Sequence, residues 1–354
     1  MTVFETTPPE VTESPASVPG DDGVAEAAPT KMTKKRKAKI TALVIALVIL
    51  ALLFAWYLMN RKPLSDLPGL SDGKLPHYEF SIYGTARPLG VAATASGDRI
   101  YVTASDGDRL VHVYDNKGKA VGTLQPPKST GASHTPIYVA INPTNQNVYV
   151  SDRVATSIYI YDAKGTYLRT FAPKGNLGEF APLALAFAPD GTLYASDVYD
   201  GTAKKQRIVS FAPDGTVLRS MGKPGELNFP NGIAVDPQGD IEVSDSGNGR
   251  VVVFSPYGKI MAMINRGIGE GDLGLPKGAA VDDSGRLFIA DTTDHMVRVF
   301  TIGASGKTPT YFGSFGGEGQ TDGTFEYPNG VATDKRAHIY ITDRENNRVQ
   351  VWGY

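Results

Sequence analysis

The sequence predicts an all-β fold made of six repeated units, each with four antiparallel strands. Its 354 residues include 39 glycines and 24 prolines without a Gly-X-Y period, which favours many short strands joined by turns. A Pro-x-Gly-like strand start recurs at intervals of 46 to 52 residues, and no stretch between these starts keeps a 3.6-residue apolar period. This repeat length fits a propeller blade better than a helical repeat, so we predict a six-bladed β-propeller.

Composition and charge exclude other classes of protein. The chain is 41% hydrophobic and 20% charged with a formal net charge of -2, which is typical of a globular protein and predicts no nucleic-acid partner. Because the chain contains no cysteine, disulfides, thiolate metal sites and thiol nucleophiles are excluded.

Residues 1–39 are predicted to form a disordered cytoplasmic tail. The first thirty residues are rich in Pro, Thr, Glu and Ala, so they cannot bury enough apolar surface to fold. Six Lys and Arg residues then lie between residues 31 and 39, directly before an uncharged segment.

The segment from Ile40 to Met59 is predicted to be a transmembrane helix, which makes the membrane a partner of the chain. It has twenty residues and, apart from Thr41, no polar face. As a helix it would be about 30 Å long, the thickness of a hydrocarbon core. A cleaved signal peptide is the alternative, but it fits poorly because a long tail precedes the basic run and no small-residue cleavage site follows Met59. The basic excess before the span predicts a single-pass protein of the cell membrane with a cytoplasmic N-terminus and an extracytoplasmic propeller.

Residues 60–76 are predicted to be a linker and residues 77–354 the propeller. The blade starts are Pro88, Pro136, Pro182, Pro230, Pro276 and Pro328. The first strand of each unit is dominated by small residues, as an inner strand crowded around a central axis requires. The sixth unit has residues for only three strands, whereas an unassigned strand, Tyr78 to Gly84, precedes the first unit. We therefore expect Tyr78 to Gly84 to complete the last blade and to protect its exposed edge.

The last three units resemble NHL repeats. Their sequences are FPNGIAVDPQGDIEVSDSGNGRVVVF, LPKGAAVDDSGRLFIADTTDHMVRVF and YPNGVATDKRAHIYITDRENNRVQVW. The resemblance extends more weakly over the first three units, and it implies a binding module more often than an enzyme. The layout is also similar to the extracellular sensor end of bacterial receptor kinases, although this chain has no kinase catalytic loop.

One face of the propeller is the candidate binding surface, because the start of the first strand and the loop between the second and third strands share one end of a blade. The residues that follow the blade-starting prolines are expected at the pore rim, and they are Leu89, Ile137, Leu183, Asn231, Lys277 and Asn329. Three are apolar and three are polar, a combination that pockets use to bind and orient a ligand. The alternative is that these residues only satisfy the strand starts.

The longest loop between a second and a third strand, Asp197 to Ile208, adds further candidates for partner binding. These are Tyr199, Lys204, Lys205 and Arg207. Long loops on a rigid scaffold often carry function, although a solvated charged insertion is the alternative.

Carboxylates that recur at the end of the second strand are predicted to be structural rather than catalytic. They are Asp152, Asp197, Asp245, Asp291 and Asp343, and the downstream arginines Arg250 and Arg348 belong to the same pattern. Because the pattern follows the repeat, we expect hydrogen bonds from arginine to aspartate that fix the loop. Glu242 instead occupies a position that is aromatic in the other units. Either a neighbouring blade pairs this carboxylate or the site is open, and we expect a partner because unpaired burial is costly.

The sequence thus predicts a membrane-anchored, extracytoplasmic binding or scaffold module of a bacterial envelope, with no catalytic residues, metal or cofactor. The alternative is a metal-dependent lactonase-like hydrolase or an amidating-lyase-like enzyme with a site at the central pore. The inner strands lack the acidic ligands that calcium needs. The two histidines expected on the loop face, His134 and His295, belong to different blades, which disfavours a zinc site. A purely mechanical spacer is a third interpretation.

Overall fold

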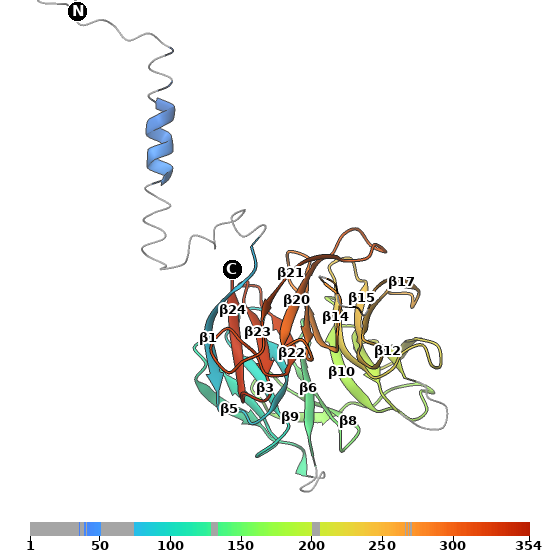
Figure 1. Ribbon diagram of the computed structural model, residues 1–354. Helices are drawn as coiled ribbons and strands as arrows, with labels where there is room; N and C mark the ends of the chain where they lie inside the picture. The colour runs from blue at the N-terminus through green and yellow to red at the C-terminus, as the bar shows by residue number, and fades with distance from the viewer. Residues whose placement is uncertain are drawn as a thin grey trace, which may run out of the picture. The chain divides into compact units, whose positions relative to one another are not determined.

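The computed structural model describes residues 74–128, 134–199, 206–265, 267, 269 and 271–354, together with residues 35, 39 and 41–50. The chain divides into two units, Met1–Leu64 and Ser65–Tyr354. In the first unit residues 41–50 are helical (Figure 1). Half of the predicted span from Ile40 to Met59, residues 40 and 51–59, lies outside the described residues. Among the residues that are described, no helix combines the length and the apolar character needed to cross a membrane.

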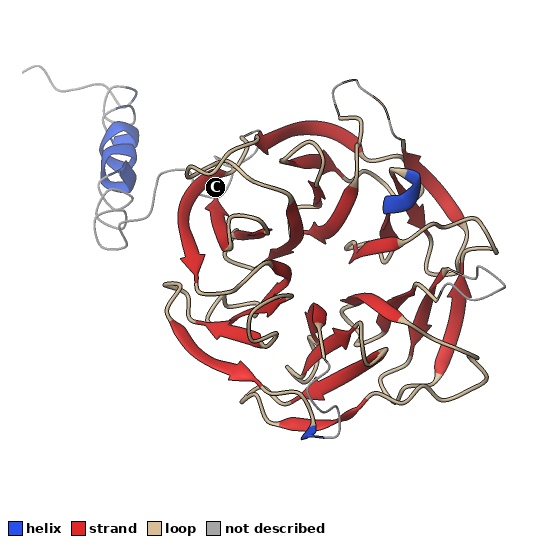
Figure 2. Cartoon of the chain, turned by 60° about the horizontal axis from the view of Figure 1, so that its bottom comes forward, coloured by secondary structure: helices blue, strands red, loops and turns tan. Residues whose placement is uncertain are grey.

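The second unit is a six-bladed β-propeller, as predicted, with blades arranged around a central axis (Figure 2). Blade 1 consists of β2 (Pro88–Ala93), β3 (Ile100–Ala104), β4 (Val111–Tyr114) and β5 (Ala120–Leu124). Blade 2 consists of β6 (Pro136–Ile141), β7 (Val148–Asp152), β8 (Ser157–Tyr161) and β9 (Tyr167–Thr170). Blade 3 consists of β10 (Pro182–Phe187), β11 (Leu193–Asp197), β12 (Arg207–Phe211) and β13 (Val217–Met221).

Blades 4 to 6 follow the same antiparallel pattern. Blade 4 consists of β14 (Pro230–Val235), β15 (Ile241–Asp245), β16 (Arg250–Phe254) and β17 (Ile260–Ile264), with the 3-10 turn η3 (Ser246–Asn248) after β15. Blade 5 consists of β18 (Pro276–Val281), β19 (Arg286–Asp291), β20 (Met296–Thr301) and β21 (Thr310–Gly316). Blade 6 consists of β22 (Pro328–Thr333), β23 (Ile339–Asp343), β24 (Arg348–Gly353) and β1 (His77–Tyr83).

The N-terminal strand closes the last blade. Strand β1 pairs with β24 in antiparallel register from His77 opposite Gly353 to Tyr83 opposite Arg348, and Figure 1 shows the two strands side by side. The predicted closure is therefore correct, with the strand beginning and ending one residue earlier than expected. Closure covers the edge of β24 with the first strand of the propeller, so the two ends of this unit hold each other in place.

The inner strands form a continuous ring in which each first strand contacts the first strands of both neighbouring blades. Glycine allows this close approach. A Cβ added at Gly232 or Gly278 would collide with the backbone carbonyl oxygen of Lys277 or Asn329 in the next blade. The small residues of the first strands thus let six backbones meet around one axis.

Hydroxyl groups at the second strands bond across the blade boundaries. Thr103 Oγ1 donates to the Ile137 carbonyl at 2.9 Å, and Ser151 Oγ donates to the Leu183 carbonyl at 2.6 Å. Thr342 Oγ1 donates to the Leu89 carbonyl at 2.9 Å, which joins the sixth blade to the first. These bonds satisfy carbonyl groups that the inner strands would otherwise bury unpaired.

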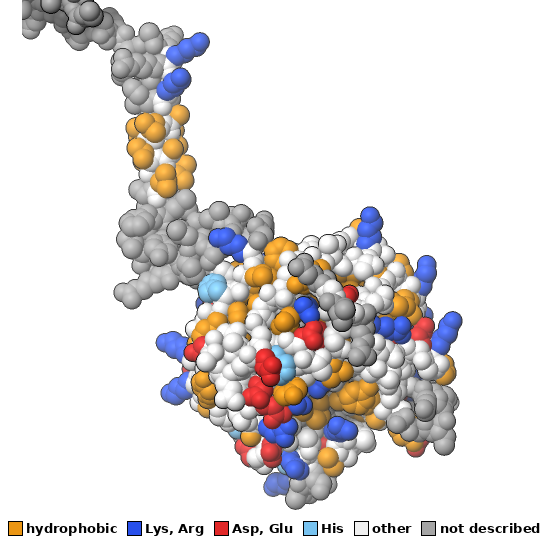
Figure 3. Space-filling view, in the orientation of Figure 1, with side chains coloured by type: hydrophobic (Ala, Val, Ile, Leu, Met, Phe, Trp, Pro, Cys, Tyr) orange, Lys and Arg blue, Asp and Glu red, His pale blue; other side chains and the backbone are white. Residues whose placement is uncertain are grey.

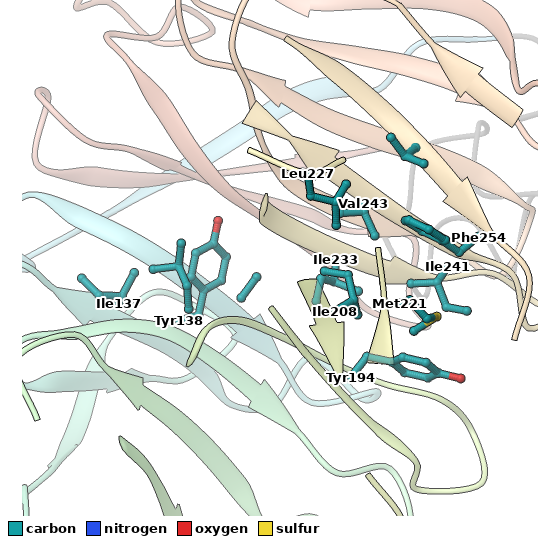
Figure 4. Close-up of a cluster of buried hydrophobic side chains, with 13 residues drawn as sticks. Ile137, Tyr138, Tyr194, Ile208, Met221, Leu227, Ile233, Ile241, Val243 and Phe254 are labelled. Atoms are coloured by element: carbon teal, nitrogen blue, oxygen red, sulfur yellow. The ribbon is translucent and has the colours of Figure 1, made fainter. Parts of the chain in front are cut away.

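Apolar side chains fill the space between adjacent blades. One cluster extends from Ile137 and Tyr138 on β6 to Phe254 on β16 (Figure 4). On the face that Figure 3 shows, acidic and basic side chains lie among one another rather than in an area of one sign. This mixed surface agrees with the small net charge of the chain.

Candidate functional site

The loop face is the end of the propeller that carries the blade-starting prolines and the loops between second and third strands. Pro230 lies opposite Asp245 in the sheet register, and Pro328 lies opposite Asp343. The start of each inner strand therefore shares one end of its blade with the loop that follows the second strand. The opposite face carries the turns between third and fourth strands, such as the turn that contains Tyr257.

The apolar rim residues lie together on the loop face. Ile137 and Leu183 are buried in one cluster, and Leu89 packs against that cluster from the neighbouring blade. We call Leu89, Ile137 and Leu183 the apolar sector of the rim. It covers three consecutive blades, as the sequence order implied.

Asn231, Lys277 and Asn329 form the polar sector, on the other three blades. Asn231 and Asn329 are buried, whereas Lys277 is half-buried. Lys277 makes no ion pair or side-chain hydrogen bond with any residue that the structure describes. Burial, together with the positive charge of Arg344, lowers the pKa of Lys277 from 10.5 to about 8.

A tyrosine connects the two sectors. Tyr138 occupies the position that is glycine in blades 1, 4, 5 and 6, and it is buried. Its hydroxyl donates a hydrogen bond to Asn231 Oδ1 at 3.0 Å, from blade 2 to blade 4. This bond uses the acceptor of the Asn231 amide and leaves its Nδ2 donor group without a partner among the described residues.

Arginines and a glutamate extend the polar sector along the boundary between blades 6 and 1. Arg87 Nη2 lies 2.6 Å from Glu345 Oε1, and Arg344 Nε lies 2.8 Å from the same oxygen. The Arg344 guanidinium also lies over the Tyr327 ring, 5.4 Å from its centroid. One carboxylate is thus shared by two cations, of which Arg344 also acts on Lys277.

Side chains that precede the third strand cap the start of the next blade. Asn347 Oδ1 accepts a hydrogen bond from the Arg87 backbone N–H at 2.8 Å, and His295 Nδ1 accepts one from the Tyr327 N–H at 3.3 Å. His295 and Tyr327 also pack their rings against each other, with centroids 4.6 Å apart. His295 therefore has a role in holding two blades together, at the position equivalent to Asn347.

The repeated aspartates are buried and bind loop backbone. Asp245 accepts hydrogen bonds from the Asn228 N–H at 2.6 Å and from Arg250 Nε at 2.8 Å. Asp343 bonds in the same way to the Glu326 N–H and to Arg348 Nε. Asp152 and Asp291 also accept backbone N–H groups from the loop before their own blade. This geometry fixes the loop that leads into each inner strand.

In the long loop of blade 3, some residues follow the pattern of the repeated aspartates and arginines, and others lie outside the described residues. Arg207 Nε donates to Asp197 Oδ2 at 3.0 Å, so Arg207 occupies the position of Arg250 and Arg348. The Tyr199 backbone N–H donates to Asp197 Oδ1, and an interaction with Glu179 raises the pKa of the Tyr199 hydroxyl. Lys204 and Lys205 lie outside the described residues. Neither Tyr199 nor Arg207 contacts a residue of the pore rim in the described hydrogen bonds.

A groove of about 380 Å³ lies between blades 2 and 3 on the same face. Phe171, Leu177, Phe180 and Asn176 belong to its walls. The groove lies along the outer part of the loop face, because its wall includes β8 and the loop that connects β9 to β10. It is a second concave surface, separate from the pore rim.

Glu242 differs from the expectation that a neighbouring blade pairs it. Its side chain is fully buried, and neither carboxylate oxygen has a hydrogen-bond partner among the described residues. Burial and the negative charges of Asp236 and Asp240 raise its pKa well above the ordinary value. In blade 6 the equivalent Tyr340 hydroxyl donates to Asp334 Oδ2 at 2.8 Å, whereas Glu242 makes no such bond to Asp236. Within the described ranges, no group of three or more His, Asp or Glu side chains is arranged to hold a metal ion.

The sequence did not identify several residues of this site. Tyr138 could have been found by comparing the repeats, because it replaces the glycine of the blade start. Tyr327 had a similar signal, since an aromatic residue directly before the proline occurs in only part of the repeats. The sequence does not mark Arg344 or Glu345. The approach of Arg344 to Lys277 and of Glu345 to Arg87 depends on how neighbouring blades pack.

Comparisons with known proteins agree with the repeat. The NHL repeat model matches residues 227–254 and 325–352. A segment of 39 residues is 51% identical to the E3 ubiquitin-protein ligase TRIM71 of Bos taurus, and the same identity is found for the protein of Gallus gallus. The match covers 11% of this chain and only 4% of the length of that relative.

Solved structures with the same fold include three kinds of enzyme. A gluconolactonase from Xanthomonas campestris is 18% identical, with a TM-score of 0.60 over 80% of this chain and 95% of its own. A streptogramin B lyase is 12% identical, with a TM-score of 0.55 over 78% of this chain and 97% of its own. An aldose sugar dehydrogenase from Streptomyces coelicolor is 16% identical, with a TM-score of 0.55 over 79% of this chain and 98% of its own. At these identities the likeness shows the fold alone. The chain is a six-bladed β-propeller that contains NHL repeats.

Proposed function

We propose that this protein is a binding module whose loop face takes a protein or a small ligand at the pore rim. The observation that carries the proposal is the division of one rim into an apolar sector and a polar sector. Leu89 packs against the cluster of Ile137 and Leu183, whereas Lys277 and Asn329 have no side-chain partners among the described residues. Apolar area next to unsatisfied donors is the combination that binds and orients a ligand.

The scaffold around the rim supports this function. Each inner strand is held by its neighbours, and inter-blade hydrogen bonds such as Thr342 to Leu89 fix the backbone of the rim residues themselves. A rigid frame of this kind keeps side chains in place before a ligand arrives, which lowers the entropy lost on binding.

The proposal includes the location of the module. We propose that Ile40 to Met59 anchors the chain in the cell membrane of a bacterium and that the propeller is extracytoplasmic. Support comes from the uncharged twenty-residue segment and the six basic residues before it. Because the chain has no cysteine, a single introduced cysteine is a unique label. Asn116→Cys, on the exposed surface of the propeller, should react with a membrane-impermeant maleimide on intact cells, whereas Ser17→Cys should react only after permeabilisation. The reverse labelling pattern would contradict this topology.

The binding proposal is tested by photocrosslinking with a matched pair of tyrosines. Tyr327 is 39% exposed on the loop face, and Tyr257 is 78% exposed on the opposite face. A photoreactive phenylalanine derivative replaces each tyrosine in the full chain, and crosslinked products are analysed on intact cells. We expect a defined product at residue 327 and none of the same mass at residue 257. Products of equal mass and yield at both positions, or none at residue 327, would contradict a loop-face site.

A further inference from the structure

We propose that the polar sector of the rim binds the anionic group of a small ligand, a carboxylate or a phosphate, while the apolar sector holds its hydrocarbon part. The inference rests on the proposed binding function of the loop face and names the chemistry of the ligand. It follows from the charges and donors around Lys277 and from the apolar sector on the other three blades.

The first observation is a positive charge without a compensating one. Lys277 is half-buried and has no carboxylate partner among the described residues. The positive charge of Arg344 repels the protonated form of Lys277. The carboxylate that pairs with Arg344, that of Glu345, is already in ion pairs with both Arg344 and Arg87. These four side chains together carry three positive charges and one negative charge when Lys277 is protonated.

Such an excess is costly for the protein itself. A half-buried cation near a second cation loses hydration and is repelled, and no partner among the described residues recovers either loss. An anion that enters the rim would recover both, because it replaces the lost hydration and neutralises the repulsion.

The second observation is the set of hydrogen-bond donors beside Lys277. The Tyr138 hydroxyl fixes the Asn231 amide with its oxygen occupied, so that Nδ2 remains as a donor. Asn329, on the other side of Lys277 in the ring, makes no side-chain hydrogen bond with the described residues. Donors on three consecutive inner strands suit an acceptor group with several oxygens.

The third observation is the apolar half of the same rim. Leu89, Ile137 and Leu183 occupy the three blades opposite the polar sector, and they belong to one packed cluster. Ile137 and Leu183 are already buried, so a purely inorganic anion would leave the partly exposed Leu89 uncovered. A ligand with an anionic group and a hydrocarbon part would cover both sectors.

The test uses three small probes of similar size and the purified full chain. Benzoate carries a carboxylate, phenyl phosphate carries a phosphate, and benzyl alcohol is an uncharged control. Calorimetric titration at pH 7 should show one site for benzoate or phenyl phosphate, with an affinity at least about tenfold higher than for benzyl alcohol. The anion that binds more tightly identifies the chemistry of the ligand.

Two substitutions locate the binding. Lys277→Met keeps an unbranched side chain, one atom shorter, but removes the charge, and it should weaken anion binding at least about tenfold. Arg344→Gln should weaken anion binding in the same direction. Lys259→Met, at an exposed position on the opposite face, is the matched control and should bind like the unmodified chain. Equal affinities for benzoate, phenyl phosphate and benzyl alcohol would overturn the proposal, as would unchanged anion binding in both rim variants. A loop-face crosslink at residue 327 that persists in that case would show that the binding function stands and only the anion assignment fails.

Discussion

The Tyr138 hydroxyl lies 3.0 Å from Asn231 Oδ1 and thereby ties the apolar sector of the pore rim to the polar sector. Tyr138 comes from blade 2 and Asn231 from blade 4, so the bond joins two blades with blade 3 between them in the ring. Blade 3 has Ala184, a small and fully buried residue, at the position that corresponds to Tyr138. The amide of Asn231 consequently has one defined orientation.

Tyr138→Phe removes only this hydroxyl. We expect a loss of about 0.5 to 1.5 kcal/mol in the free energy of unfolding, because Asn231 Oδ1 loses its donor. Weaker anion binding should accompany this loss, since the amide is then free to rotate. Denaturant unfolding and calorimetry measure the two effects. Tyr101→Phe is the control, because Tyr101 is equally buried and donates no hydrogen bond among the described contacts.

Lys277→Met should stabilise the unliganded protein. The pKa of Lys277 is lowered to about 8 in the folded state from 10.5. Below pH 8 the lysine is charged in both states, and holding that charge in the folded protein costs stability relative to the unfolded chain. Removing that charge should raise the free energy of unfolding at pH 7 by about 0.5 to 2 kcal/mol. The difference should shrink as the pH rises from 8 towards 10, because the wild-type lysine becomes neutral. Unfolding curves at several pH values measure it. A variant less stable than wild type at pH 7 would mean that Lys277 is well solvated or paired.

Glu242→Gln should stabilise the protein at high pH and have little effect at low pH. Because burial beside Asp236 and Asp240 raises the pKa of Glu242, the folded state favours the protonated acid. Wild type therefore loses stability as the pH rises above 4.5, the ordinary value. We expect the glutamine variant to exceed wild type by about 1 to 3 kcal/mol at pH 8 and to approach it near pH 4.5.

A second variant at this position checks the cause. Glu242→Tyr restores the residue type of most other blades and places a hydroxyl towards Asp236, as Tyr340 does towards Asp334. It should also be more stable than wild type at pH 8. If both variants are less stable than wild type across the pH range, the buried carboxylate has a partner that the described contacts do not contain.

Thr342→Val should weaken the closure of the ring. Thr342 Oγ1 donates to the Leu89 carbonyl and accepts from the Gly330 N–H at 2.6 Å, so valine leaves two buried groups unpaired. We expect a loss of about 1 to 3 kcal/mol in the free energy of unfolding. Thr123→Val on the exposed strand β5 is the control and should change stability by less than about 0.5 kcal/mol. Equal effects of the two substitutions would contradict a special role for Thr342.

Arg250→Met tests the structural assignment of the repeated aspartates. Asp245 is fully buried and keeps only the Asn228 N–H and Asn248 as donors once the arginine is lost. The free energy of unfolding should fall by about 1.5 to 3 kcal/mol, whereas the affinity of the rim for benzoate should not change. Thermal unfolding and calorimetry separate the two outcomes. A loss of affinity without a loss of stability would assign Arg250 to binding instead.

The fold was predictable from the sequence because the repeat constrains it. The position of each proline, the small residues after it and the aspartate at the end of the second strand recur in register, so strand order follows from the spacing. The closing strand was predictable because the sixth unit lacked a strand and residues 78–84 supplied one. Strand ends differed by a residue, as for β1, which runs from His77 to Tyr83 rather than from Tyr78 to Gly84.

The site was only partly predictable. The six rim positions follow from the repeat, since each directly follows a blade-starting proline. The Tyr138–Asn231 bond and the sharing of Glu345 between Arg87 and Arg344 do not, because they connect residues of different blades. The absence of a described partner for Glu242 was also unpredictable, since the sequence shows a residue type but not what surrounds it.

A crystal structure of the protein soaked with benzoate tests the central claim most directly. We expect density for the ring against the partly exposed Leu89, with the carboxylate within about 3 Å of Lys277 Nζ. Density for the probe only in the groove of Phe171, Leu177 and Phe180 would contradict it, as would an empty rim at concentrations where calorimetry shows binding.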